Sequence, residues 1–308
     1  MGQNSIRFRI MIKIINKLRR LLKGDKINTY VRIIISLISL IYLYFKLDWS
    51  ALELIDDSIL LYFISSLPIS ALGLFFMAIR WKMLIETILK LKINVIDLYK
   101  FYYIANFWGL FLPGSIGGDA TRIYNSKEKY DIDLTHATAF VLIERIMGFV
   151  AVILIFSLGS MMVSEPKFLV QFNNILYILI ITIATSLIFK DKIFKNCSYL
   201  VNNKTIFFII CLSMLAQFGD IVIVKLFSSY FNLAITIYHF MVIMPIIYVV
   251  STLPISLGGL GIREGTMVAL FSLFGFDASI SVVISLLLYF TKIFMGLVGM
   301  IIYIKRDS

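Results

Sequence analysis

The chain has 308 residues, of which 60% are hydrophobic, with a mean hydropathy of +0.93 and a formal net charge of +11. Soluble domains use about 45–50% apolar residues, so this composition excludes an ordinary soluble protein and predicts one transmembrane domain over residues 31–308. The positive charge does not indicate nucleic-acid binding, because it is concentrated before the first apolar run and in connections between later runs. We expect an all-α polytopic membrane protein, since helices satisfy their own backbone hydrogen bonds in lipid.

Residues 1–30 are predicted to form a basic cytoplasmic juxtamembrane segment. Nine Lys and Arg side chains, interleaved with Ile, Leu, Met and Phe, precede or open the first apolar run. Such an amphipathic stretch is suited to an anionic lipid surface; a solvated tail that only sets the topology has the same composition. The basic residues are Arg7, Arg9, Lys13, Lys17, Arg19, Arg20, Lys23, Lys26 and Arg32.

Apolar runs of about 20 residues bounded by charge predict about six full membrane crossings. They are expected near residues 31–47, 59–79, 137–162, 168–189, 205–227 and 279–304. Two further apolar segments, near residues 98–124 and 238–274, are interrupted by proline and glycine.

The Lys and Arg residues of the connections orient these crossings. Basic connections at residues 80–100 and 190–204 are expected to be cytoplasmic, as are both termini, whereas the acidic connection at 48–57 and the uncharged one at 228–236 are expected outside. Each interrupted segment must then enter and leave on one side of the membrane. The first returns to the cytoplasm and the second to the outer side.

These two re-entrant hairpins of opposite sense define an inverted-topology repeat. We place the first repeat at about residues 58–162, a linker helix at 168–189 and the second repeat at about 205–304. A weaker likeness in the helix after each hairpin supports the division, between Arg145-Ile146-Met147-Gly148-Phe149-Val150 and Lys292-Ile293-Phe294-Met295-Gly296-Leu297-Val298.

Both interrupted segments carry the same pattern, L-P-x-S-x-G-G-x-x-x-R. The copies are Leu112-Pro113-Gly114-Ser115-Ile116-Gly117-Gly118-Asp119-Ala120-Thr121-Arg122 and Leu253-Pro254-Ile255-Ser256-Leu257-Gly258-Gly259-Leu260-Gly261-Ile262-Arg263. The proline stops the incoming helix, and the glycine pair permits backbone angles closed to other residues before a new half-helix begins. A helix N-terminus with an arginine one turn inside it is suited to a phosphate group.

We therefore predict an anionic headgroup at the two hairpin tips. The candidate residues in the tips are Arg122, Arg263, Ser115, Gly117, Gly118, Asp119, Ser256, Gly258 and Gly259. The alternative is a tight turn with close packing, in which Arg263 only pairs with the neighbouring Glu264.

Six charged residues lie inside apolar runs: Glu144, Arg145, Asp220, Arg263, Glu264 and Lys292. A charge at the centre of a membrane helix costs about 2.5–3.5 kcal/mol on insertion scales, so such residues usually pair or face a cavity. Glu144 and Arg145 are sequence neighbours pointing about 100° apart on a helix. We therefore expect their partners elsewhere, such as Arg122 or Asp119. Asp220 is expected to pair with Lys225, unless that lysine snorkels toward the outer interface.

No metal or cofactor site is predicted. Cys197, Cys211, His136 and His239 are scattered without metal-ligand spacing. Aromatic residues leading into the first tip indicate an interfacial belt and packing surface, or a groove for acyl chains. They are Phe101, Tyr102, Tyr103, Phe107, Trp108 and Phe111.

Taken together, the motifs resemble those of the lysylphosphatidylglycerol synthase transmembrane region, also called the flippase-like domain family. The residues that carry the resemblance are Asn106, the run from Leu112 to Arg122, the pair Glu144-Arg145, and Pro254-Ile255-Ser256 with Gly258-Gly259-Leu260-Gly261-Ile262-Arg263-Glu264-Gly265. The second motif is the more specific. Glu144 departs from the Arg or Asp typical of that position, but keeps a carboxylate role plausible.

The resemblance implies a multi-pass protein of a bacterial or archaeal inner membrane, related to the membrane half of the multiple peptide resistance factor. In that protein such a domain moves aminoacylated phospholipid between leaflets. The candidate headgroup site also includes Asn106, Glu144, Arg145 and Glu264, which belong to the resembling motifs, and Lys292, one of the charged residues inside apolar runs. Since the chain ends soon after its last apolar run, we expect a stand-alone member without the cytosolic transferase domain.

The function expected from the sequence is transport of a membrane phospholipid or a polyprenyl-phosphate glycolipid. One alternative is a membrane enzyme, either a phosphatidylglycerol lysyltransferase of lipid metabolism and cationic peptide resistance or a glycolipid transferase. Another is a non-transporting partner of a lipid-modifying enzyme or glycosyltransferase, with the basic N-terminal segment as its docking surface. No nucleophile and base pair, P-loop or G-x-S-x-G motif occurs in the sequence.

Overall fold

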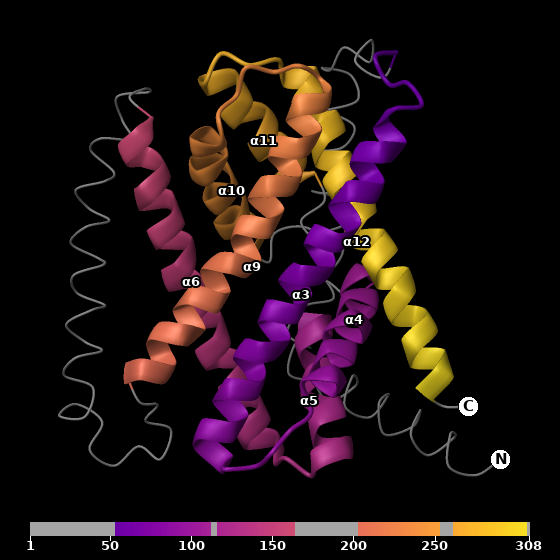
Figure 1. Cartoon of the computed structure of the whole chain (residues 1–308), viewed down its shortest axis with the longest axis vertical. Helices are drawn as coiled ribbons and strands as arrows, with labels where there is room; N and C mark the ends of the chain where they lie inside the picture. Colours follow the sequence, from indigo (N-terminus) through magenta and orange to yellow (C-terminus); the bar gives the residue numbers. More distant parts are fainter. Residues whose placement is uncertain (1–52, 112–115, 164–202, 253–260, 307–308) are drawn as a thin grey trace, which may run out of the picture.

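The computed structural model describes residues 53–111, 116–163, 203–252 and 261–306 (Figure 1). Within these ranges every regular element is an α-helix, which confirms the all-α prediction for this part of the chain. The helices are α3 (Ile59–Leu89), α4 (Val95–Phe111), α5 (Ile116–Tyr130), α6 (Leu134–Met162), α9 (Asn203–Tyr230), α10 (Ile237–Thr252), α11 (Ile262–Leu273) and α12 (Ala278–Arg306). The basic segment 1–30 and the crossings predicted at 31–47 and 168–189 lie outside the described residues.

Four of the described helices are long and apolar enough to cross a membrane: α3, α6, α9 and α12. They coincide with four of the predicted crossings. Helix α3 runs further than expected, to Leu89, because its last turns bury Arg80, Trp81, Leu84 and Ile85 against neighbouring helices. The expectation that Arg80 belongs to a connection is therefore wrong.

The helices on either side of each break are too short to cross. Helices α4, α5, α10 and α11 have 17, 15, 16 and 12 residues, or about 18–26 Å at 1.5 Å per residue. The hydrocarbon core is about 30 Å thick. In Figure 1 the pair α4 and α5 lies at one end of the molecule and the pair α10 and α11 at the other. The two hairpins thus enter from opposite ends.

The packing of the helices repeats in the two halves. Helix α3 packs on α9, while α4 packs on α12 and α10 packs on α6. The second helix of each hairpin packs on the helix that follows it, α5 on α6 and α11 on α12. Exchanging α3 to α6 for α9 to α12 leaves this pattern unchanged, as an inverted repeat requires.

Glycine allows the close crossings between halves. A Cβ on Gly299 of α12 would come within 2.0 Å of the Tyr103 carbonyl oxygen of α4. A Cβ on Gly159 of α6 would come within 2.6 Å of the Cβ of Met241 on α10. Small residues at these positions let the backbones approach, which is how membrane helices commonly associate.

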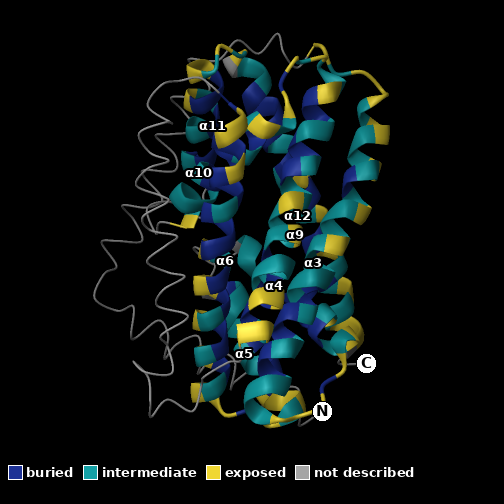
Figure 2. Cartoon of the chain, turned by 60° about the vertical axis from the view of Figure 1, so that its left-hand side comes forward, coloured by how far each residue is buried: buried dark blue, intermediate teal, exposed yellow. Residues whose placement is uncertain are grey.

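Two large apolar clusters lie between the described helices, and each contains residues from both halves of the chain. The first surrounds Trp81, Tyr102 and Phe140, and the second surrounds Phe240 and Phe271. Buried residues line the inner faces of the helices, while exposed ones are spread over the outer faces (Figure 2). The first cluster lies directly beside the charged residues of the first hairpin.

Candidate functional site

Four helices bring polar side chains together at the first hairpin, charged ones from α3, α5 and α6 and a tyrosine from α4. We name this set the first-hairpin cluster: Arg80 of α3, Tyr102 of α4, Asp119 and Arg122 of α5, and Glu144 and Arg145 of α6. Arg122 Nη1 donates to Glu144 Oε2 and to the Tyr102 hydroxyl, both at 2.6 Å. Its Nη2 donates to Asp119. The arginine predicted to bind a headgroup is therefore already bound by side chains of three helices.

Glu144 is the acceptor at the centre of the cluster. Its Oε1 accepts from Arg80 and from the Tyr102 hydroxyl, and its Oε2 accepts from Arg122. Arg80 also donates to Ser213 Oγ of α9 at 2.7 Å. Glu144 is only 3% exposed. The expectation that Glu144 pairs with Arg122 rather than with its sequence neighbour is confirmed.

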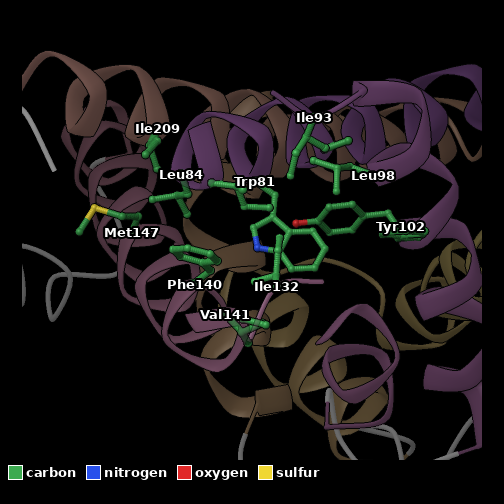
Figure 3. Packing of buried hydrophobic residues seen from close by; sticks show 14 of the residues in the cluster. Trp81, Leu84, Ile93, Leu98, Tyr102, Ile132, Phe140, Val141, Met147 and Ile209 are labelled. Carbon is green, nitrogen blue, oxygen red and sulfur yellow. The ribbon is translucent and has the colours of Figure 1, made fainter. Parts of the chain in front are cut away.

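Aromatic rings complete the enclosure of Arg122. Its guanidinium carbon lies 4.6 Å from the ring centre of Tyr102 and 4.9 Å from that of Trp81. The two rings pack edge to face, with their centres 5.9 Å apart, and Figure 3 shows the hydroxyl end of Tyr102 beside Trp81. Cation–π contacts of this kind strengthen when desolvated. The Arg122 guanidinium group is therefore bound by aromatic rings as well as by hydrogen bonds.

Asp119 links this buried core to a more exposed group. It lies in the first turn of α5 and accepts from both Arg122 and Arg145. The Arg145 side chain is 41% exposed, whereas that of Asp119 is 16% exposed. Among the described side chains of the cluster, three guanidinium groups and two carboxylates sum to a formal charge of +1. The N-terminal end of α5 adds partial positive charge beside Asp119.

The second hairpin has a smaller charged group, the second-hairpin cluster of Arg263, Glu264, Ser285 and Tyr289. Arg263 pairs with the adjacent Glu264, as the alternative reading of the motif foresaw. Glu264 Oε2 also accepts from the backbone N–H of Gly261 at 2.7 Å and so caps the start of α11. Arg263 Nε donates to Ser285 Oγ at 3.3 Å, and its guanidinium carbon lies 4.9 Å from the Tyr289 ring centre. This cluster is neutral.

A third charged group joins α9, α10 and α12. Asp220 accepts from the Tyr248 hydroxyl at 2.6 Å and lies 3.5 Å from Lys292 Nζ. The expected pairing of Asp220 with Lys225 is wrong, because Lys225 donates instead to the Ile235 carbonyl at 2.8 Å. The sequence separates Asp220 from Lys292 by a whole hairpin, so only the packing of α9 on α12 could reveal the pair.

Of the remaining predicted site residues, three lie in the described helices α4 and α5. Gly117 is buried in the first turn of α5, and Gly118 packs so closely that a Cβ would lie 3.0 Å from the Ala105 carbonyl oxygen. Asn106 is half-buried on α4, without a side-chain hydrogen bond to another described residue. Ser115, Ser256, Gly258 and Gly259 lie outside the described residues. No group of three or more His, Cys, Asp or Glu that could hold a metal occurs in the described ranges.

Two residues of the first-hairpin cluster were not among the predicted site residues, Arg80 and Tyr102. A sequence signal existed for Arg80, because it continues the helical run of α3 next to Trp81. For Tyr102 the aromatic run before the break gave only a general packing expectation.

The comparisons with known proteins support the family resemblance. The family model described as the lysylphosphatidylglycerol synthase TM region matches residues 30–299. No curated protein and no solved structure matches the chain.

Proposed function

Because the chain belongs to the lysylphosphatidylglycerol synthase TM region family, we propose that it transports a phosphate-bearing lipid across a bacterial or archaeal cell membrane. The headgroup binds beside the two hairpins, at charged residues of the half-helices that follow the breaks and of the helices packed on them, and both termini of the chain are cytoplasmic. The lipid is a phospholipid or a polyprenyl-phosphate glycolipid.

The observation that carries this proposal is the excess of one positive charge among the described side chains of the first-hairpin cluster. Charged groups are costly inside a membrane, and buried ones are normally neutralised by partners. Here Arg80, Arg122 and Arg145 outnumber Asp119 and Glu144 by one charge. A phosphate monoanion beside the start of α5 would neutralise the cluster and meet the positive end of a helix.

The opposed hairpins supply a route between the two faces of the membrane. The α4–α5 hairpin and the α10–α11 hairpin lie at opposite ends of the molecule (Figure 1), and each carries a charged group. In transporters with inverted repeats, one repeat rocks against the other around a central site. We propose that the same movement exposes the headgroup to each face in turn.

The test is a translocation assay with purified protein in phosphatidylcholine vesicles. Fluorescent phosphatidylglycerol and fluorescent phosphatidylcholine are compared as substrates, with protein-free vesicles as the control. We expect protein-dependent movement of phosphatidylglycerol between leaflets, and slower movement of zwitterionic phosphatidylcholine.

Either of two results would overturn the proposal. One is translocation no faster than in protein-free vesicles for every phosphate-bearing lipid tried. The other is formation of lysyl-phosphatidylglycerol from charged tRNA by the purified chain, which would assign it to the enzyme class instead.

A further inference from the structure

The cations of the three charged groups fall into two classes by exposure. The side chains of Arg80, Arg122 and Arg263 are 6–8% exposed, and each has a carboxylate partner from the protein. Arg145 and Lys292 are 41% and 38% exposed. A ligand can reach the second class without dismantling the packing around the buried arginines.

Arg145 and Lys292 also occupy corresponding places in the two repeats. Each lies on the helix that follows a hairpin, α6 or α12, in the short stretch of sequence likeness between those helices. Each forms an ion pair with a carboxylate from another helix, Asp119 of α5 or Asp220 of α9. The cation is the duplicated part; the less exposed carboxylate that holds it comes from helices that do not correspond, α5 in one repeat and α9 in the other.

The depth of these cations argues against contact with lipid tails. Lys292 is 14 residues from either end of the 29-residue helix α12, or about 21 Å along its axis. Arg145 is 11 residues from the start of α6, or about 16 Å. A charge exposed at this depth is expensive unless it faces water or a polar ligand.

Both carboxylates keep a second partner if the accessible cation leaves. Asp119 also accepts from the buried Arg122, and Asp220 also accepts from the Tyr248 hydroxyl at 2.6 Å. The Lys292 to Asp220 contact is long, at 3.5 Å. An incoming anion can therefore take the cation without leaving the carboxylate unpartnered, which would be costly in a membrane interior.

We infer that Arg145 and Lys292 are two successive contacts for the lipid phosphate, and that Asp119 and Asp220 are the counterions that the phosphate displaces. This inference rests on the proposed transport function and deepens it. It assigns the buried Arg122 and Arg263 a positioning role, since they fix the half-helices. The phosphate passes from the accessible cation of one repeat to that of the other.

Lipid binding tests the inference separately from transport. Detergent-purified protein is titrated with phosphatidylglycerol, and bound lipid is counted by native mass spectrometry. Lys292→Gln is expected to weaken binding about tenfold, because it removes a charged donor to the phosphate. Asp220→Asn is expected to strengthen binding, because Lys292 then lacks its competing carboxylate. Lys292→Arg, which keeps the charge, is the matched control and should retain most of the affinity.

The same opposite signs are expected in the first repeat, with Arg145→Gln weakening binding and Asp119→Asn strengthening it. An ion pair that serves only the fold predicts otherwise. In that case both members of a pair lower the thermal stability, and neither changes lipid affinity after correction for folded protein. That outcome would overturn the inference.

Two further measurements are needed. One distinguishes a lipid headgroup from free phosphate, and the other distinguishes failure of the binding inference from failure of the transport proposal. Inorganic phosphate should compete poorly with phosphatidylglycerol; equal competition would show a free-anion site and contradict the lipid assignment. If the binding effects appear while the wild-type protein moves no lipid, the transport proposal and the passage between the two cations fail, and Arg145 and Lys292 remain assigned as phosphate contacts. If lipid moves but Lys292→Gln and Arg145→Gln bind and move it normally, the inference fails alone.

Discussion

The two hairpins carry the same sequence pattern but hold their arginines differently. In the first, Arg122 is bound by Tyr102 of α4 and Glu144 of α6, and Glu144 is bound in turn by Arg80 of α3. In the second, Arg263 pairs with Glu264, the next residue of its own helix. Its other contacts among the described helices are with Ser285 and Tyr289 of α12. Neutralisation is shared among helices in one case and is largely local in the other.

The motif therefore specifies the position of each arginine, while the surrounding helices determine which groups the arginine contacts. Ser285 of α12 bonds Arg263, whereas the carboxylate of Glu144 on α6 bonds Arg122. In the first hairpin either arginine can be lost without leaving Glu144 unpaired, because Glu144 has two arginine partners. In the second hairpin this does not hold, because Glu264 has Arg263 alone among the described cations.

The two hairpins are expected to enter the membrane from opposite faces. Cysteine labelling tests this, because each introduced cysteine should react from one face and not from the other. Lys127, near the end of α5, and Asp277, between α11 and α12, are both exposed. In a background with Cys197 and Cys211 changed to serine, we expect Lys127→Cys to react only from the cytoplasmic side and Asp277→Cys only from the outside. Reaction of both from one side would remove the inverted repeat.

Because Glu144 has two arginine partners and Glu264 has one, we expect loss of Arg263 to lower the free energy of unfolding more than loss of Arg122. Arg263→Gln leaves the buried Glu264 without a cation, and should lower stability by about 3–5 kcal/mol. Arg122→Gln leaves Glu144 paired with Arg80 and Asp119 paired with Arg145, and should cost about 1–2 kcal/mol through lost hydrogen bonds and ring contacts.

Thermal unfolding in detergent measures this order, with Arg263→Lys and Arg122→Lys as charge-conserving controls. A larger loss for Arg122→Gln than for Arg263→Gln would show that the shared network is not redundant.

Glycine substitutions separate the tight packing of the first hairpin from the open packing of the second. Gly118→Ala would place a Cβ 3.0 Å from the Ala105 carbonyl oxygen, and we expect a loss of about 1 kcal/mol as α5 is pushed from α4. Gly265→Ala meets no atom within 4 Å and should gain about 0.5–1 kcal/mol from helix propensity. If both substitutions raised stability, or both lowered it, in thermal unfolding, the difference in packing between the two positions would be refuted.

The smallest effect is expected where α3 begins and α9 ends, outside both hairpins. The Tyr230 hydroxyl accepts from the Asp56 N–H at 2.8 Å and lies 3.0 Å from an Asp56 carboxylate oxygen. Hydrogen bonds from Ser58 and Tyr230 lower the pKa of Asp56. Tyr230→Phe should lower Tm by roughly 2 °C or less at neutral pH, because this site is exposed.

A lowered pKa in the folded state means that the stabilising contribution is present above the unfolded pKa of Asp56, about 3.9, and is lost as pH falls. The difference between wild type and Tyr230→Phe should therefore shrink in acid. A difference that grew below pH 4 would contradict this assignment.

The sequence predicted the four described crossings, because hydropathy acts locally; the residues of the two predicted breaks lie outside the described ranges, between short helices. It also predicted that Glu144 and Arg145 pair outside their own turn, from the helical period. It misplaced Arg80, since the rule that basic residues mark connections does not distinguish a buried arginine near a helix end from a solvated one. The partner of Asp220 could not be predicted, because Lys292 is brought to it by tertiary packing.

The lipid preference of the Arg122→Gln variant in the vesicle assay tests whether the excess positive charge of the first-hairpin cluster serves the lipid headgroup. This substitution lowers the formal charge of the first-hairpin cluster from +1 to zero and leaves both of its carboxylates paired. We predict a folded protein that moves phosphatidylglycerol about tenfold more slowly than wild type, with Arg122→Lys retaining part of the rate. Unchanged movement of phosphatidylglycerol by folded Arg122→Gln would contradict the claim that the excess positive charge serves an anionic headgroup.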